Sequence, residues 1–255
     1  LPAKVFPKPV IEPDKPWEGR MLAFFGTALE HEGGYRLYYT RLKPGTHLNV
    51  MLAESDDGFQ WRKPELGLIE CDGSTANNIV LDPGCHNDGP SIVLDPDDPQ
   101  HPYKMMVFWK GDRSQPWGPD WGLHGFQSAD GIKWEPTDPP VVLVAGDRTN
   151  MMVNKPEGKF VTYTRHMNMF NHTGGRAVYR SESDDFLHWT EPQLVLRPDL
   201  QDEPDIEFYG MSAFQHNGWY FGLLEYWSHA TDTFEIHLVF SRDGINWSRP
   251  SPRSA

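Results

Sequence analysis

A short motif, Ser-x-Asp-(Gly/Phe)-x-x-Trp, occurs four times along this chain. The copies start at residues 55, 128, 183 and 241. Within each copy the Asp can accept hydrogen bonds from nearby backbone amides, and the Gly tolerates a positive φ. The Trp can pack against the neighbouring strand. A motif repeated every 50 to 70 residues or so is typical of a stacked or radial array, so it predicts one identical β-hairpin turn per structural unit.

The segments around each motif predict four strands per unit. Each motif is preceded by an aromatic-rich, alternating second strand that follows a tight turn, and a first strand lies before that turn. The expected first strands are 22–29, 90–94, 151–154 and 208–215, and the second strands are 33–39, 101–108, 158–163 and 218–224. Third strands lead into the motif, as at 49–54 and 235–240, and fourth strands follow it, as at 140–143 and 193–196. Repeated four-stranded antiparallel units predict an all-β fold, a β-propeller. A β-sandwich is the alternative, but it does not explain one identical hairpin per unit.

The repeat divides the chain, a single domain over residues 1–255, into four blades. Their approximate bounds are 12–72, 73–143, 144–197 and 198–255. Residues 5–11 resemble an isolated fourth strand, because 7–11 echo residues 191–195. Either this N-terminal strand closes a four-bladed ring or a fifth blade is absent from the chain.

The net charge of −13 argues against nucleic acid and anionic membranes as partners. No run of about 18 apolar residues is present to span a membrane.

The chain begins without Met, which suggests a removed leader, but no signal peptide is visible. Cys71 and Cys85 are the only cysteines and are either one disulfide or two thiols. No cofactor motif is present, and no oxygen-ligand motif requires a metal, although a structural Ca²⁺ is compatible with related propellers.

Several short segments occur in an order that resembles a known family. They are 16–18, 25–27, 38–40, 53–58, 77–80, 103–105, 179–183 and 241–244. The chain resembles bacterial secreted proteins with a glycoside hydrolase family-32-like N-terminal domain. These are relatives of the five-bladed propeller superfamily that includes families 32 and 43. The resemblance implies a five-bladed propeller, a carbohydrate substrate, glycosidic bond hydrolysis and a secreted or periplasmic location.

In such enzymes the catalytic acids stand near the starts of the innermost strands. Glycoside hydrolysis needs one carboxyl group to protonate the leaving oxygen and another to attack carbon or activate water. The matching positions are Asp88, Asp147 and Glu207. We expect Glu207 to be the general acid, Asp88 the nucleophile or base, and Asp147 an orienting acid. The first-blade aspartate of the family is not matched, and Glu18 stands near its place.

Other residues are candidates for substrate contacts or for alternative roles. The expected substrate-binding residues are Glu18, His86, Arg148, Arg165, Tyr209 and Trp109. Glu203 and Asp205 crowd Glu207, and either is an alternative acid. The motif aspartates Asp57, Asp130, Asp185 and Asp243 and the motif tryptophans Trp61, Trp134, Trp189 and Trp247 are expected to be structural.

Two other functions remain open. One is a non-catalytic propeller that binds carbohydrate. The other is a sialidase-like exo-glycosidase, because the repeated turn resembles the sialidase Asp-box. A sialidase would need three arginines that clamp a carboxylate. The candidates are Arg113, Arg148, Arg165, Arg176 and Arg180. The oligomeric state and the sugar specificity are not predicted by the sequence.

Overall fold

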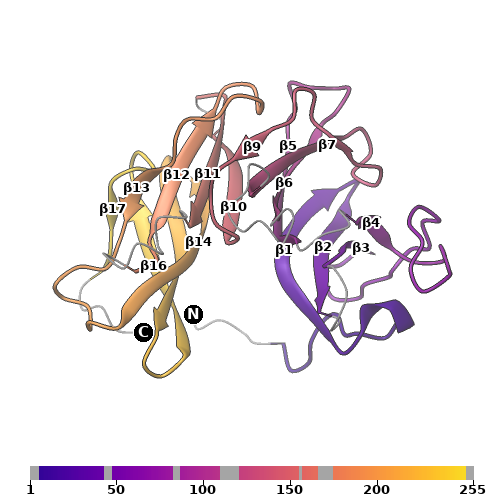
Figure 1. The fold of residues 1–255 in the computed structure, drawn as a ribbon, viewed down its shortest axis with the longest axis horizontal. Helices are drawn as coiled ribbons and strands as arrows, with labels where there is room; N and C mark the ends of the chain where they lie inside the picture. The colour runs from indigo at the N-terminus through magenta and orange to yellow at the C-terminus, as the bar shows by residue number, and fades with distance from the viewer. Residues whose placement is uncertain are drawn as a thin grey trace.

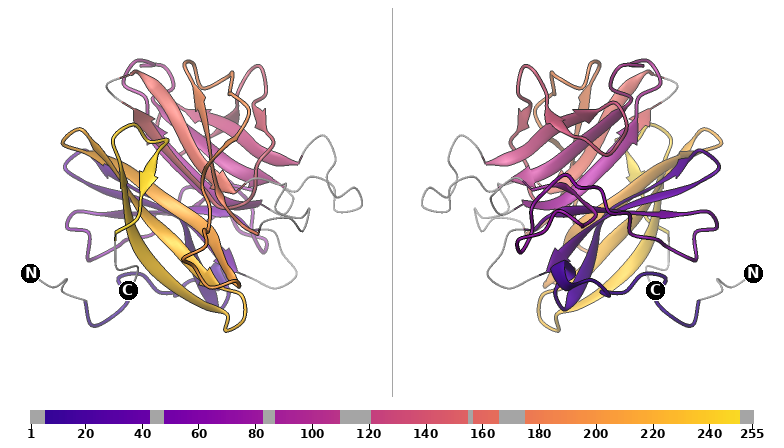
Figure 2. Two further views of the ribbon diagram at one scale, coloured as in Figure 1. Left: turned by 90° about the vertical axis from the view of Figure 1, so that its left-hand side faces the viewer. Right: turned by 90° about the vertical axis from the view of Figure 1, so that its right-hand side faces the viewer.

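The computed structural model describes residues 6–42, 48–82, 87–109, 121–154, 157–165 and 175–250. These residues form four antiparallel sheets that follow one another along the chain. Figure 1 shows the sheets arranged around a common centre, from β1–β4 to β14–β17. Figure 2 shows from the sides that each sheet is twisted. The predicted all-β propeller with four antiparallel blades is confirmed.

The first two blades span the first half of the chain. Blade one contains β1 (Met21–His31), β2 (Gly34–Leu42), β3 (Val50–Ser55) and β4 (Ile79–Leu81). Blade two contains β5 (Asn87–Leu94), β6 (Tyr103–Trp109), β7 (Gly122–Ser128) and β8 (Glu135–Pro136), and β9 (Val142–Leu143) also pairs with β7. A single turn of 3₁₀-helix, η1 (Pro16–Glu18), precedes β1.

The last two blades repeat this order. Blade three contains β10 (Thr149–Asn154), β11 (Lys159–Arg165), β12 (Val178–Ser183) and β13 (Gln193–Leu196). Blade four contains β14 (Ile206–His216), β15 (Trp219–Ser228), β16 (Thr233–Ser241) and β17 (Trp247–Ser248). Contacts of β5 with β1, of β10 with β5 and of β14 with β10 place these four first strands innermost. In the described part of the chain, no helix is long and apolar enough to cross a membrane.

Two expected boundaries differ from the structure. Blade one extends past residue 72, because β4 pairs with β3 only after a long connection. The expected closing strand at residues 5–11 is not a strand over its described part, residues 6–11. Pro7 and Pro9 lie in this stretch, and proline has no backbone N–H to donate to a ladder. Blade four instead takes its fourth strand from β17.

The repeated motif forms the predicted turn in every blade. In the first copy, Asp57 Oδ1 accepts the amides of Phe59 and Gln60, both at 2.8 Å. Ser55 Oγ accepts the Gly58 amide at 2.9 Å, and Trp61 Nε1 donates to the Gly58 carbonyl at 3.1 Å. The aspartate bonds recur at Asp130, Asp185 and Asp243. The structural role expected for the motif aspartates is therefore confirmed.

The turns also join neighbouring blades. The Tyr38 hydroxyl of blade one donates to the Gly131 carbonyl in the turn of blade two at 2.9 Å. The Tyr163 hydroxyl of blade three donates to the Gly244 carbonyl in the turn of blade four at 2.8 Å. A Cβ at Gly131 or Gly244 would lie only 2.5 or 2.6 Å from these hydroxyl oxygens. Glycine is therefore needed at both turns for contact as well as for φ.

The turn of blade three uses a different pair of residues. Phe186 replaces the glycine, has a φ of +67° and is only 1% exposed. At the position where blades one and three carry tyrosine, blade two carries Met106, which lies in the same buried cluster as Phe186. A small turn residue thus faces a tyrosine, and a large turn residue faces a flexible methionine.

Blade four is the last sheet, and among the described residues no turn of a following blade packs against its outer face, the face that carries Leu223. Its equivalent of Tyr38 and Tyr163 is Leu223, which is 43% exposed. Other large apolar side chains near it are also exposed: Phe214, Phe234, Ile236 and Leu238.

We expect the variant Tyr163→Phe to lower the free energy of unfolding by about 1 kcal/mol, because the Gly244 carbonyl loses the shorter of its two hydrogen bonds and keeps only the one from Trp247 Nε1. Urea denaturation of both proteins measures the change. Tyr35→Phe, at a half-exposed ring of blade one, is the control and should leave stability unchanged. Equal stability of Tyr163→Phe and the parent would contradict the proposed joint.

Acid stability should depend on the motif aspartates. The pKa of Asp243 is lowered because the Asn246 amide, the Asn246 side chain and the Ile245 amide donate to its carboxylate. A folded-state pKa below the unfolded value of about 4 stabilises the protein above that pH, and the stabilisation is lost as pH falls. Asp243→Asn should therefore be less stable at neutral pH and lose less further stability on acidification. Denaturation across a pH series checks this, with exposed Asp184→Asn as control; an unchanged pH slope would refute it.

Candidate functional site

The three predicted acids stand at the starts of three innermost strands. Asp88 is the second residue of β5, Asp147 lies two residues before the start of β10, and Glu207 is the second residue of β14. Gly89 has a φ of +57°, and a Cβ there would lie 2.7 Å from the Asp147 carbonyl oxygen. Glycine thus lets the start of blade two contact the start of blade three.

Glu207 forms an ion pair with an arginine from blade three. Arg176 Nη1 donates to Glu207 Oε2 at 2.7 Å. The Arg176 guanidinium also lies 4.4 Å from the Trp227 ring centroid and 5.0 Å from the Tyr209 centroid. A Cβ at Gly175 would lie 3.1 Å from Glu207 Cγ, so this glycine leaves space for the acid.

Tyr209 is displayed by a β-bulge. Phe208 pairs with Tyr226 and Gly210 pairs with Glu225, so Tyr209 is the extra residue on β14. Bulges commonly redirect a side chain next to a functional site. The Tyr209 ring meets Phe234 edge-on at 5.0 Å and lies 4.1 Å from the Arg165 guanidinium carbon.

Arg148 crosses the bulge to reach blade four. Its Nε lies 2.9 Å from both carboxylate oxygens of Glu225 on β15, and its Nη2 also bonds this acid. A Cβ at Gly210 would collide with Arg148 Cγ. Burial acts to lower the Arg148 pKa, but the bonded Glu225 and the nearby Asp88 outweigh it, so this pKa is raised.

Arg165 is the most buried cation of the group. It is 4% exposed and forms an ion pair with Asp147. Its pKa is lowered by burial and by repulsion from Arg176, while Tyr209 and Asp88 act in the opposite direction. Arg165 thus interacts with residues from three blades.

We call this group the axial cluster. It comprises Asp88, Asp147, Arg148, Arg165, Arg176, Glu207, Tyr209, Glu225 and Trp227. Six of the predicted site residues belong to it: Asp88, Asp147, Arg148, Arg165, Glu207 and Tyr209.

Other predicted site residues lie elsewhere. Glu18 is fully buried, where it accepts the Asp14 and Lys15 amides at 2.9 Å and the Tyr39 hydroxyl at 2.8 Å. Lys63 completes its bonds, so Glu18 supports η1 and does not join the axial cluster. Trp109 ends β6 and packs against His124 at 4.7 Å. His86, Cys85 and Arg113 lie outside the described residues.

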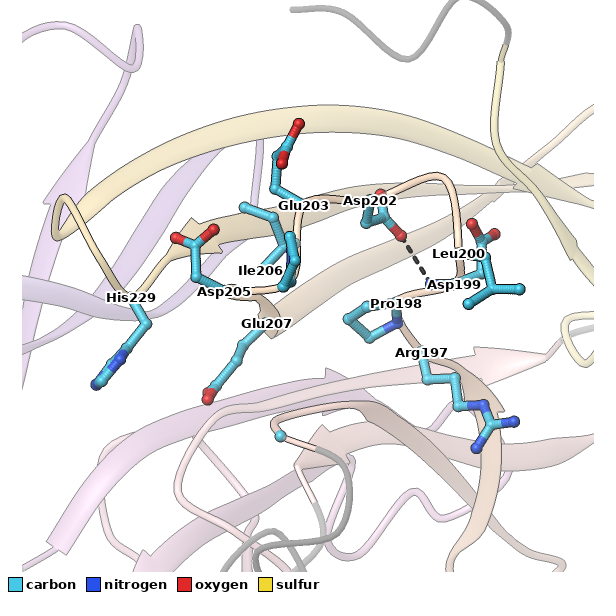
Figure 3. Close-up of a pocket in the computed structure, with 12 residues that line it drawn as sticks. Arg197, Pro198, Asp199, Leu200, Asp202, Glu203, Asp205, Ile206, Glu207 and His229 are labelled. Carbon is cyan, nitrogen blue, oxygen red and sulfur yellow. Dashed lines mark hydrogen bonds between the residues drawn. The ribbon is translucent and has the colours of Figure 1, made fainter.

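The structure separates the crowded acids near Glu207. Asp205 accepts the Ser228 hydroxyl at 2.6 Å and the Ala230 amide at 3.1 Å, and these bonds lower its pKa. It is therefore a turn residue and is poorly suited to donate a proton. Figure 3 shows Glu207 and His229 pointing to one side, whereas Glu203 and Asp205 point to the other.

A pocket of about 820 Å³ lies beside the axial cluster. Its lining runs through the connection from blade three to blade four and ends at Glu207. The lining residues are Gly175, Arg197, Pro198, Asp199, Leu200, Asp202–Ile206, Glu207 and His229. Carboxylates and an imidazole are suited to hydrogen bonds with sugar hydroxyls.

Three cluster residues, Arg176, Glu225 and Trp227, are not among the site residues predicted from the sequence. Arg176 was only one of five candidate arginines; Arg180, another of them, pairs instead with Glu182 at 2.7 Å. Glu225 was missed entirely, although a lone acid within the apolar strand Leu223–Trp227 was a usable signal. Among the described residues no group of three His, Cys, Asp or Glu side chains could hold a metal. Cys71 is a free thiol.

No family model and no curated protein sequence matches the chain. Solved structures do match its fold. A thermostable family-43 glycoside hydrolase aligns with a TM-score of 0.67 and 15% identity, over 92% of this chain and 74% of the other. A family-43 β-1,3-galactosidase, solved with galactodeoxynojirimycin, gives 0.62 and 13%, over 94% and 80%. An N-acetylgalactosamine deacetylase from F. plautii, in complex with blood group B trisaccharide, gives 0.59 and 17%, over 94% and 67%.

The chain therefore has the propeller fold found in several glycoside hydrolase structures, as the sequence resemblance implied. The deacetylase shows that this fold also carries a different reaction. The reaction must consequently be argued from the side chains of the site.

Gly210→Ala should disturb the axial cluster sterically, because the added methyl group meets Arg148. We expect a loss of about 1–3 kcal/mol in the free energy of unfolding, as for overpacking at a buried site. The double variant Gly210→Ala/Arg148→Ala should show a smaller loss than the sum of the two single changes, because the clash is gone. Chemical denaturation of the three variants checks this, and strictly additive losses would contradict it.

Proposed function

We propose that the protein is a glycoside hydrolase that cleaves an oligo- or polysaccharide with carboxylates of the axial cluster. The observation that carries the proposal is that Asp147 and Glu207, from two blades, are linked through Arg165, Tyr209 and Arg176, beside a pocket that ends at Glu207. Asp88, from a third blade, is an electrostatic neighbour of Arg148 and Arg165. Paired carboxylates on either side of a sugar are the groups that this reaction needs.

The environments of the acids suggest their roles. Glu207 lines the pocket, so it is placed to protonate the oxygen of a leaving sugar held there. Asp88 is an electrostatic neighbour of Arg148 and Arg165, and we assign it the role of the carboxylate that attacks the anomeric carbon or activates water. Asp147 holds Arg165, which is an orienting role. A location outside the cytoplasm, implied by the sequence resemblance, belongs to the same proposal.

The general-acid role gives a specific expectation for Glu207→Gln. Hydrolysis of unactivated oligosaccharides should fall about a hundredfold or more, the usual contribution of a positioned acid. Dinitrophenyl glycosides should lose much less rate, because their leaving group needs no proton. Asp88→Asn should lose activity on both kinds of substrate. Glu32→Gln, at an 85% exposed side chain in the β1–β2 turn, is the matched control and should retain full activity.

Steady-state rates on a panel of aryl glycosides and on plant and algal oligosaccharides measure these effects. Equal activity of Glu207→Gln and the parent on oligosaccharides would remove Glu207 as the acid. Binding of oligosaccharides by the parent without any hydrolysis would favour the non-catalytic carbohydrate-binding propeller instead.

A further inference from the structure

Two guanidinium groups lie against the same tyrosine ring in the axial cluster. The Cζ atoms of Arg165 and Arg176 are 4.1 and 5.0 Å from the Tyr209 ring centroid. The two cations are close enough for their repulsion to contribute to the lowered Arg165 pKa. Each guanidinium is paired with its own acid, Arg165 with Asp147 and Arg176 with Glu207, and an anion shared between the two cations would reduce their mutual repulsion further.

The acids of the cluster use only part of the hydrogen-bonding capacity of these arginines. Each guanidinium has five N–H donors. Arg165 contacts Asp147 through Nη2, and Arg176 bonds Glu207 through Nη1. The Nε atoms of both arginines are buried and have no hydrogen-bond partner among the described residues. The Arg165 residue as a whole is only 4% exposed to solvent.

Arg148 has a different role. Its Nε and Nη2 both bond Glu225, so its planar fork is already occupied by a carboxylate. This pair fixes the bulge that displays Tyr209. Arg165 and Arg176 therefore remain as the cations with donors available to a ligand.

We propose that the sugar bound at this site carries an anionic group, a carboxylate or a sulfate, that binds between Arg165 and Arg176. The inference rests on the proposed function only in taking the ligand to be a sugar. Guanidinium groups recognise planar carboxylates and other oxyanions through paired, charge-assisted hydrogen bonds. A neutral hydroxyl group would leave the repulsion between the two cations in place.

This arrangement also links recognition to the proposed proton donor. An anion bound at Arg176 shares the guanidinium charge with Glu207 and so weakens this ion pair. Binding of the charged sugar would then release the Glu207 carboxyl group towards the glycosidic oxygen, whereas a neutral sugar would leave the ion pair intact.

Isothermal titration calorimetry with matched sugar pairs tests the inference. The probes are the methyl glycosides of glucuronic and galacturonic acid against those of glucose and galactose, and galactose sulfate against galactose. We expect at least one charged sugar to bind about tenfold or more tightly than its neutral partner, the size of effect given by charge-assisted hydrogen bonds. The uronide and sulfate arms distinguish the two anions.

Arg176→Gln and Arg165→Gln should each remove most of this preference. Arg62→Gln, at a 60% exposed side chain beside the first-blade turn, removes the same charge and should keep it. Arg176, whose side chain is 28% exposed, provides the test if the buried Arg165 variant does not fold.

The outcomes separate this inference from the proposed hydrolysis. Tighter binding of a charged sugar without any hydrolysis supports the inference and opposes the proposed hydrolase activity. Hydrolysis of neutral sugars with no charged sugar bound more tightly overturns the inference and leaves the hydrolase. A preference that survives in Arg176→Gln also overturns it.

Discussion

The packing of one blade against the turn of the next is the constraint on which the structure depends. Tyr38 and Tyr163 each donate into the turn of the following blade, and Phe186 fills the same place from the opposite side of a joint. The motif aspartates support these joints, because their carboxylates accept the turn amides and hold the turns whose Gly131 and Gly244 carbonyls accept the tyrosine hydroxyls. The repeated turn is therefore a joint between sheets as well as the end of a hairpin.

These joints determine where the first strand of each blade begins. Successive blades packed at a fixed angle bring β5, β10 and β14 side by side at the centre. Gly89 and Gly210 then allow the closest approaches, of Asp147 to blade two and of Arg148 to blade four. Residues far apart in the sequence, such as Gly89 and Asp147, come into contact in this way.

The sequence was sufficient to predict the blades because each strand is marked locally. The hairpin motif supplies the register, and the first strands follow by counting back from it. The same counting found Asp88, Asp147 and Glu207, since a position at a strand start is a local property. It did not find Glu225, whose importance comes from Arg148 reaching across the Tyr209 bulge. Asp205 and Glu207 looked equivalent because only tertiary contacts with Ser228 and Arg176 distinguish them.

Glu18 shows that a position near a strand start does not by itself identify a site residue. It stands close to the start of β1, as a site acid would, yet it is buried under four hydrogen bonds from its own segment, Tyr39 and Lys63. Stability alone does not account for the axial cluster in the same way. Burying an ion pair costs about as much desolvation as the attraction returns, so packed apolar side chains would serve a core equally well. Three arginines and four acids at the centre of the propeller, around a tyrosine displaced by a bulge, are therefore the reason for proposing that this cluster binds a charged or hydroxyl-rich ligand.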